Sequence, residues 1–211
     1  MELTVQQVLM DLEKLPIGYK TADVDRLIRG YVRSRCDASP LRLFILTEQQ
    51  LHRIYYYVAL KQLREVGARM EFIHHNLLFS DWWHTDQLIG FVADLELKEA
   101  LAYAEHYVQD PDPFIRRWGY VLFISRLGRG HAREILPLTH NDEQYTVRMA
   151  QGWLISDLAV YEPEYVLQWI SGNDLRYDIN GIAIQKICDS YRISGEWKER
   201  FKALRPRLKA K

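Results

Sequence analysis

Apolar residues recur at helical spacing along most of this chain. Two stretches show it most clearly, with apolar positions Phe114, Trp118, Val121 and Leu122 in the first and Ala150, Trp153, Leu154 and Leu158 in the second. Steps of three or four residues place such side chains on one face of an α-helix. Alternating runs joined by hairpin dipeptides, which indicate strands, are nearly absent. The pattern therefore predicts an all-helical protein.

Four polar residues mark expected helix starts: Thr47, Asp112, Asn141 and Ser194. Thr47 and Asn141 are each followed three positions later by a glutamine, so the two side chains can satisfy free backbone donors reciprocally. Asp112 precedes Pro113, and a proline at the first helical position loses no needed donor. We expect a helix to begin directly after each of the four.

The helices between about residues 43 and 201 are short, and so are their connections. Such a pattern predicts consecutive antiparallel helix pairs whose small apolar faces must stack, as in an α-solenoid. No strict sequence period is visible, so the repeats are degenerate. We expect a single repeat domain over 1–211, with residues 203–211 as a basic tail. Residues 1–40 are the least clear part, because Pro16–Gly18 interrupts the first helix and Ser39–Pro40 the second.

Composition narrows the possible functions. A hydrophobic fraction of 48% and a charged fraction of 27% are ordinary for a soluble globular protein. The 28 basic and 28 acidic residues cancel, which argues against a generic basic DNA coat and requires local patches for any nucleic-acid contact. One candidate patch, equally readable as a frayed solvated tail, consists of Arg200, Lys202, Arg205, Arg207, Lys209 and Lys211.

Several kinds of site are not indicated. Cys36 and Cys188 lie far apart in no motif, which favours reduced thiols, and no signal peptide or membrane span is visible, so we expect a cytoplasmic protein. His74, His75 and His84 lack partners at zinc-ligand spacing. No glycine-rich phosphate loop is present. We expect no metal, no cofactor and no membrane partner.

Three segments carry a resemblance to a known family. They are Ser-Asp-Trp-Trp-His-Thr-Asp at 80–86, Phe-Ile-Arg-Arg-Trp at 114–118 and Tyr-Thr-Val-Arg-Met-Ala-Gln-Gly-Trp-Leu at 145–154. In order and spacing they resemble the AlkD-like DNA alkylation repair family. That family's pattern has a tryptophan four residues before an aspartate, then an aromatic-x-x-Arg helix, then an Ala-x-Gly-Trp helix. The turn at 161–164 and the helix at 182–186 also resemble it, so the likeness covers the last two-thirds of the chain.

The resemblance implies a superhelix of HEAT-like helix pairs that holds duplex DNA on its concave face. It also implies excision of cationic alkylpurines, such as 3-methyladenine and 7-methylguanine. We expect the protein to be a monomer. Carried over by position, the catalytic residues are Trp82, Asp86 and Trp153, with Trp83 competing for the first role if the register shifts by one. Arg117 matches the family's phosphate-facing arginine. We expect the basic lining to comprise Arg117, Arg116, Arg148 and Lys186.

The chain departs from the family pattern at two places, and other interpretations stay open. Trp83 replaces the usual aspartate after the first tryptophan, and Ser156-Asp157 replaces an Arg-Glu pair. Tryptophans at helical spacing are often core residues, as we expect for Trp118 and Trp169. Arg116 and Arg117 could instead form ion pairs with Asp110 and Asp112 at the helix start. The alternative functions are a DNA-binding scaffold of the same fold without catalysis and a protein-interaction solenoid.

Overall fold

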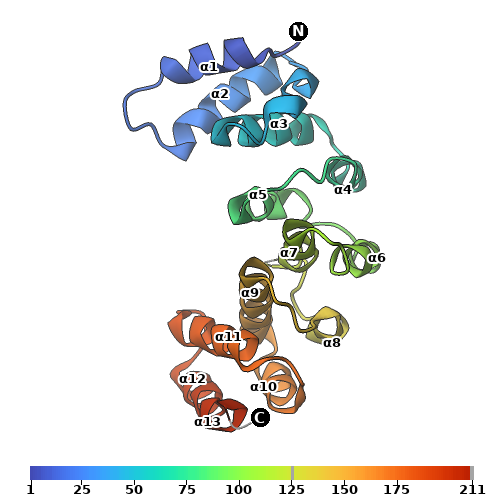
Figure 1. The fold of residues 1–211 in the computed structure, drawn as a ribbon, viewed down its shortest axis with the longest axis vertical. Coiled ribbons are helices and arrows are strands. Elements are labelled where there is room, and N and C mark those ends of the chain that lie inside the picture. The colour runs from blue at the N-terminus through green and yellow to red at the C-terminus, as the bar shows by residue number, and fades with distance from the viewer. Residues whose placement is uncertain (125, 210–211) are drawn as a thin grey trace. The chain divides into compact units, whose positions relative to one another are not determined.

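The protein is all-helical in the computed structural model, which describes residues 1–124 and 126–209 (Figure 1). The described residues form no β-strand. They contain one isolated β-bridge, between Glu2 and Asp37. The predicted all-α fold class is confirmed.

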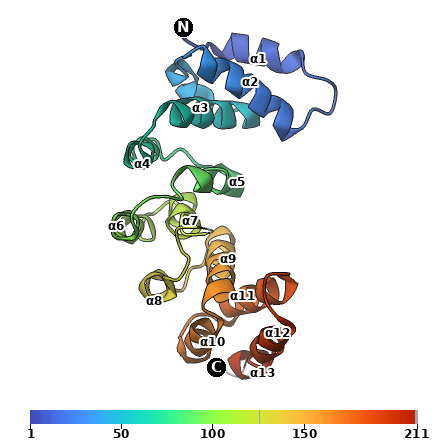
Figure 2. The same cartoon turned by 180° about the vertical axis from the view of Figure 1, so that it is seen from behind.

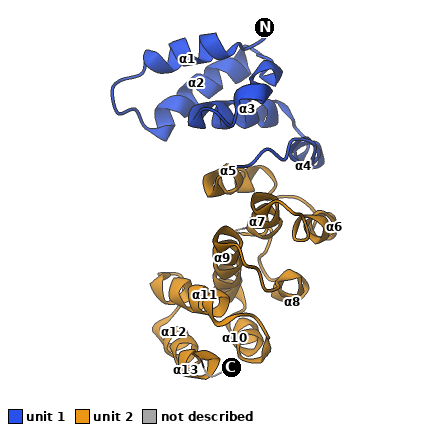
Figure 3. Ribbon diagram, in the orientation of Figure 1, with its two compact units in different colours: residues 1–80 blue, residues 81–211 orange. Residues whose placement is uncertain are grey.

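The chain divides into two compact units, residues 1–80 and residues 81–211 (Figure 3). The single repeat domain expected over 1–211 stays a prediction.

The first unit folds the residues that were least clear in the sequence. Its helices are α1 Val5–Glu13, α2 Thr21–Arg33, α3 Gln49–Gln62 and α4 Val66–His74, with a 3-10 turn at Ser39–Phe44. The interruption after α1 is a turn in which Gly18 takes a φ of +76°, a conformation that glycine adopts without strain. Pro40 lies at the start of the 3-10 turn, where its missing donor costs nothing.

The second unit contains the segments that resemble the repair family. Its α-helices are α5 Trp82–Asp86, α6 Leu97–Tyr107, α7 Pro113–Val121, α8 Ala132–Ile135, α9 Tyr145–Tyr161, α10 Pro163–Gly172, α11 Tyr177–Asp189, α12 Gly195–Lys202 and α13 Arg205–Lys209. Short 3-10 turns at Ile89–Phe91 and Leu136–Leu138 complete the described elements.

The helices of the second unit form two layers. One layer runs α5, α7, α9, α11, and each member contacts the next. The other layer contains α6, α8 and α10, of which α6 packs on α7 and α10 packs on both α8 and α9. The two layers lie side by side in both views (Figures 1 and 2). This stacking of short helix pairs is that of an α-solenoid, as predicted.

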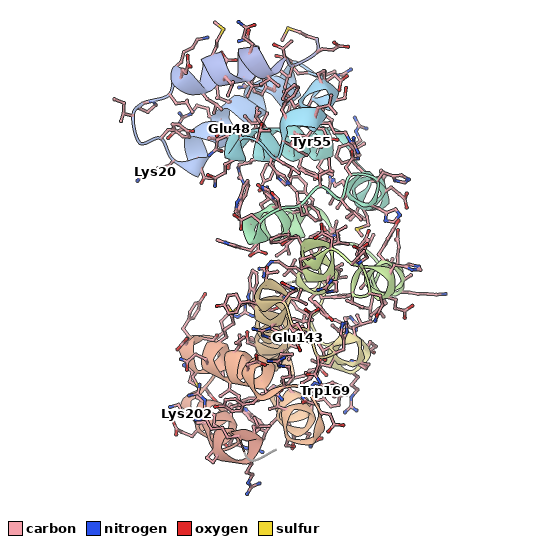
Figure 4. The ribbon with its side chains drawn as sticks, in the orientation of Figure 1. Lys20, Glu48, Tyr55, Glu143, Trp169 and Lys202 are labelled. Carbon is pink, nitrogen blue, oxygen red and sulfur yellow. The ribbon has the colours of Figure 1, made fainter. Side chains whose placement is uncertain are left out.

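The predicted apolar stripes form the core between these helices. Trp118, Val121 and Leu122 are fully buried, and so are Ala150, Leu154 and Leu158. Trp169, the other tryptophan expected in the core, is only half-buried on α10 (Figure 4). The first member of one stripe, Phe114, and the second of the other, Trp153, are also half-buried. These two rings therefore lie at the edge of the core, where they remain accessible.

Gly152 brings α9 and α11 together. A Cβ atom at this position would lie 2.4 Å from Cγ2 of Ile182 and 3.2 Å from the backbone nitrogen of Ala183. Both distances are shorter than ordinary van der Waals contact, so any larger residue would force the helices apart. The close approach of α9 to α11 therefore depends on Gly152, and Trp153 is the next residue on α9.

Two of the four predicted helix starts are confirmed. Asp112 caps α7 by accepting a hydrogen bond from Phe114 N at 2.7 Å, and Ser194 caps α12 in the same way. The prediction for Thr47 is wrong, because α3 begins after Glu48 and the threonine hydroxyl donates to a carbonyl instead. Asn141 is also not a cap, because its side chain joins the segment before α9 to the loop at 174–176.

The C-terminal residues pack against the rest of the second unit. Helix α13 contacts α11, Leu208 is buried, and Arg205 donates to Oε1 of Gln185 at 2.7 Å. The segment through residue 209 is therefore helical and not a frayed tail. Lys211, which belongs to the predicted basic tail, lies outside the described residues. No helix in the described part of the chain is both long and apolar enough to cross a bilayer.

Candidate functional site

A pocket of about 570 Å³ opens on one layer of the second unit. Its lining comes from α5, α7, α9 and α11, so four consecutive members of the layer each contribute side chains. We call it the aromatic pocket, and the residues that line it are Asp81, Trp82, Asp86, Phe114, Arg117, Tyr145, Thr146, Met149, Trp153 and Lys186. The pocket brings together all three predicted catalytic residues and two of the four predicted DNA-binding residues.

Helix α5 presents Trp82 and Asp86 on one side, one turn apart. Asp81 begins the helix by accepting a hydrogen bond from Trp82 N at 2.6 Å. The Trp82 ring is 56% exposed, which is unusual for so large an apolar side chain. The buried Thr85 hydroxyl lies 2.8 Å from the Trp82 carbonyl and 3.1 Å from Oδ1 of Asp86. Both site residues of this short helix are thus held by its own hydrogen bonds.

Asp86 forms an ion pair with Arg117 of α7. Nη2 of Arg117 lies 2.8 Å from Oδ1 and 3.0 Å from Oδ2 of the carboxylate. Nε donates toward Oδ1 and toward the Thr85 hydroxyl, each at 3.1 Å, and Nη1 donates to the Thr146 carbonyl at 2.9 Å. Only 5% of the Arg117 side chain is exposed. Its donors are therefore engaged inside the protein, and they fix the orientation of Asp86.

The two oxygens of Asp86 are unequally engaged. Oδ1 has Arg117 and Thr85 as partners, whereas the one described partner of Oδ2 is Nη2 of Arg117. A carboxylate oxygen accepts more than one hydrogen bond, so Oδ2 has capacity left. The side chain is 17% exposed and lines the pocket. Asp86 is positioned to offer negative charge, or a hydrogen-bond acceptor, to a molecule in the pocket.

Four of the ten residues that line the pocket are aromatic. Trp82, Phe114, Tyr145 and Trp153 contribute from three different helices, and Tyr145 is 65% exposed at the start of α9. The Lys186 ammonium lies 5.9 Å from the centroid of the Trp153 ring, within the range of a cation–π contact. A pocket with several indole and phenyl faces favours flat or positively charged groups.

Arg116 and Arg148, the other two predicted DNA-binding arginines, do not line the aromatic pocket. Nε of Arg116 lies 2.7 Å from Oδ2 of Asp142, and Nε of Arg148 lies 2.9 Å from Oδ2 of Asp178. Burial favours a higher pKa for Asp142, but the hydrogen bonds from Arg116 and from the Gln144 backbone outweigh it and lower that pKa. The positive charges of both arginines are thus compensated by neighbouring carboxylates.

Lys186 differs from the three arginines. It forms no ion pair with any residue in the described ranges 1–124 and 126–209, and it lines the pocket with its ammonium 5.9 Å from the centroid of the Trp153 ring. Among the four predicted basic residues, it is the one whose charge is available to a ligand.

The structure places Trp82, and not its neighbour Trp83, in the pocket lining. Trp83 stacks edge-on against His84, with ring centroids 4.0 Å apart. His84 is buried, and this burial lowers its pKa to about 4. Trp83 is half-buried beside His84, so Trp82 is the more exposed of the two adjacent indoles.

Five lining residues were not anticipated from the sequence: Asp81, Phe114 as a pocket wall, Tyr145, Thr146 and Met149. Tyr145 and Met149 lie four positions apart on the face of α9 that also carries Trp153. The four-residue spacing from Trp153 back to Met149 and Tyr145 is the feature of the sequence from which these two could have been predicted.

The Ser156-Asp157 departure lies on α9, just beyond Trp153. The Ser156 hydroxyl donates to the Trp153 carbonyl at 2.7 Å, and Asp157 forms an ion pair with Arg192 at 2.7 Å.

Within the described residues, no group of three or more histidine, cysteine, aspartate or glutamate side chains has the arrangement of a metal site.

Comparison with known proteins adds one positive finding. A family model described as DNA alkylation repair enzyme matches residues 9–178, which is most of the chain and includes α5, α7 and α9. A comparison with curated proteins finds no match.

Proposed function

Because the chain belongs to the DNA alkylation repair enzyme family, we propose that it is a DNA N-glycosylase acting on cationic alkylpurines in duplex DNA. The expected substrates are 3-methyladenine and 7-methylguanine, and the product is an abasic site. The observation that carries this proposal is the oriented carboxylate of Asp86 in the wall of an aromatic pocket.

The chemistry of the substrate explains why one carboxylate is enough. Alkylation at N3 or N7 makes the purine cationic, so the base is already a good leaving group and needs no strong general acid. As the glycosidic bond breaks, positive charge develops on the deoxyribose. A carboxylate fixed nearby stabilises that charge, and its less engaged oxygen, Oδ2, can accept a further hydrogen bond and orient the attacking water. In this mechanism Asp86 is the catalytic residue.

The aromatic walls support the same step. The faces of Trp82 and Trp153 carry partial negative charge and attract a cationic sugar or base, by about 1 kcal/mol each at a partly exposed site. Both rings line the pocket with Asp86, as a shared role requires.

We assign Arg117 a positioning role in place of the phosphate contact that the resemblance implies. Its donors engage Asp86, Thr85 and the Thr146 carbonyl, and its side chain is nearly inaccessible. We assign the phosphate contact to Lys186, which lines the pocket and has no ion pair among the residues that the structure describes.

A second candidate function is a DNA-binding scaffold without catalysis. The observation that favours it is the guanidinium of Arg117, which compensates much of the Asp86 charge on which the glycosylase mechanism depends. A third candidate function is a protein-interaction solenoid without DNA binding, which the neutral total charge of the chain supports.

Incubation with methylated duplex DNA separates these functions. The released bases are quantified by chromatography with mass detection, with no metal or nucleotide added, and DNA binding is measured in parallel. We expect release of 7-methylguanine or 3-methyladenine. Binding without release would support the scaffold, and absence of both would support the protein-interaction solenoid.

A further inference from the structure

A second pocket continues the aromatic pocket along α9 toward the C-terminal end of that helix. It has a volume of about 440 Å³, shares Trp153 and Lys186 with the aromatic pocket, and is also lined by Val160. Tyr161, the last residue of α9, follows Trp153 by eight positions, which is a rise of about 12 Å along the helix. A ligand that extends this far from the aromatic pocket along α9 reaches Tyr161.

Three arginines lie at two tyrosine rings in this region. The guanidinium carbons of Arg129 and Arg192 lie 5.3 and 5.6 Å from the centroid of the Tyr161 ring. That of Arg133 lies 4.4 Å from the centroid of the Tyr165 ring. We name these five residues the arginine–tyrosine cluster. We propose that it binds the phosphodiester backbone of the modified strand on one side of the lesion, an inference that rests on the proposed function of the aromatic pocket.

Two arginines of the cluster have charges that no carboxylate compensates. Arg129 and Arg133 are exposed, and neither forms an ion pair within the part of the chain that the structure describes. Glu162 directly follows Tyr161, but its Oε1 accepts a hydrogen bond from Ala132 N at 2.7 Å. The two guanidinium charges are therefore available to a polyanion.

The tyrosine rings leave these guanidinium groups able to bind phosphate. An aromatic ring interacts with the flat face of a guanidinium, whereas the N–H donors point outward along its edge. Arg129 and Arg192 are both within 5.6 Å of one centroid, so they lie close enough together to contact nearby phosphates of one strand. Contacts of this kind engage the outside of the duplex and leave every base paired and stacked.

The length of α9 indicates which phosphates are concerned. Phosphates of one strand recur about every 3.4 Å along the duplex axis, so a strand that follows α9 for about 12 Å advances by three or four nucleotides. Lys186 lies at the Trp153 ring and is assigned the phosphate next to the modified nucleotide. The cluster and Lys186 therefore bind different phosphates, and their contacts are separable.

Neutral methylphosphonates, each of which removes one phosphate charge and leaves the bases unchanged, test the contact. The reference duplex carries tetrahydrofuran, a stable abasic analogue, at the lesion position. In a set of further duplexes, one methylphosphonate occupies each successive position of the same strand on both sides of the tetrahydrofuran. Arg129→Gln is expected to weaken binding to the reference duplex about five- to tenfold at about 0.1 M salt.

The position at which this loss disappears identifies the contact. With a methylphosphonate three or four nucleotides from the tetrahydrofuran on one side, Arg129→Gln should weaken binding less than about twofold, because the charge that it contacts is already absent. Arg133→Gln is expected to behave in the same way at the same phosphate or the next one. Lys186→Gln should lose its effect at the phosphate beside the tetrahydrofuran.

Arg200→Gln is the matched control. Arg200 is also an exposed arginine at an aromatic ring, 4.0 Å from the centroid of Trp197, but it lines neither pocket. It is expected to bind every duplex like wild type. A loss for Arg200→Gln with none for Arg129→Gln would assign the contact to the C-terminal basic residues and overturn the cluster.

The remaining outcomes separate the cluster from the proposed function. An equal loss for Arg129→Gln on every duplex, or no loss on any, would overturn the cluster, while base release by wild type left the glycosylase standing. The expected pattern without base release would keep the cluster and overturn the glycosylase. Wild-type protein that binds none of the duplexes would overturn both.

Discussion

Arg117 and Asp86, 31 positions apart in the sequence, form a two-pronged ion pair in the wall of the aromatic pocket. The pair joins α7 to α5, and the Thr146 carbonyl extends it to the first turn of α9. A single arginine therefore connects three of the four helices that build the pocket.

Loss of this arginine should destabilise the fold. Arg117→Met leaves a largely buried carboxylate without its partner, which we expect to lower the free energy of unfolding by about 3 kcal/mol. Asp86→Asn combined with Arg117→Met should recover part of that loss, because no charge is then left unpaired. Urea denaturation of the single and double variants measures the coupling. The control is Arg126→Met, whose ion pair with Asp94 is exposed on both sides and should contribute less than about 0.5 kcal/mol. Equal effects of Arg117→Met and Arg126→Met would contradict the positioning role.

Gly152 should tolerate no larger residue. Gly152→Ala places a methyl group against Ile182, so we expect a loss of about 1–3 kcal/mol in thermal or urea unfolding. Gly172, also in a helix, has open space around its Cα, so Gly172→Ala should leave stability unchanged or slightly higher. A tolerated Gly152→Ala would mean that α9 and α11 are not in close contact.

Acid should destabilise the protein through His84. Burial lowers the pKa of this imidazole to about 4 in the folded state, from an unfolded value near 6.5. Between these two values the unfolded chain binds more protons than the folded chain, so stability falls as the pH drops from 6.5 toward 4. We expect His84→Gln to flatten the pH dependence of the urea midpoint in this window. His106→Gln, a change at an exposed residue of α6, serves as the control. Parallel pH profiles for wild type and His84→Gln would exclude this cause.

The salt dependence of DNA binding should identify the phosphate contact. Each phosphate neutralised by a cation contributes about −0.9 to the slope of log K against log salt. Lys186→Gln should therefore reduce the steepness by about 0.9. Arg116→Gln should leave the slope unchanged and lower stability, because the guanidinium of Arg116 already donates to Asp142 and to backbone carbonyls. A changed slope for Arg116→Gln, with no change for Lys186→Gln, would assign the phosphate contact to Arg116 and contradict its assignment to Lys186.

The sequence predicted the fold better than it predicted helix boundaries. The capping rule predicts a helix start from neighbouring residues alone. It succeeded at Asp112 and Ser194, whose side chains accept hydrogen bonds from the first turns of their own helices. The rule failed at Asn141 because its amide joins another loop, at residues 174–176, and such tertiary contacts are invisible in a local pattern.

The candidate site residues came from the resemblance to the repair family, which did not give their partners in the fold. Trp82 and Asp86 lie one turn apart on α5 as expected, and Trp153 lines the same pocket. No periodicity reveals that Arg117 pairs with Asp86 rather than with the nearby Asp112, because the layer that brings α5 beside α7 exists only after folding.

The central claim is that the Asp86 carboxylate stabilises the developing sugar cation. Single-turnover release of 7-methylguanine from methylated duplex DNA, with DNA affinity measured on the same samples, tests it most directly for wild type and Asp86→Asn. The asparagine keeps the shape of the side chain but removes its charge, which matters most when the sugar becomes cationic. We predict a rate that falls about 100- to 1,000-fold with affinity changed less than about threefold. Equal rates for the two proteins would contradict the account.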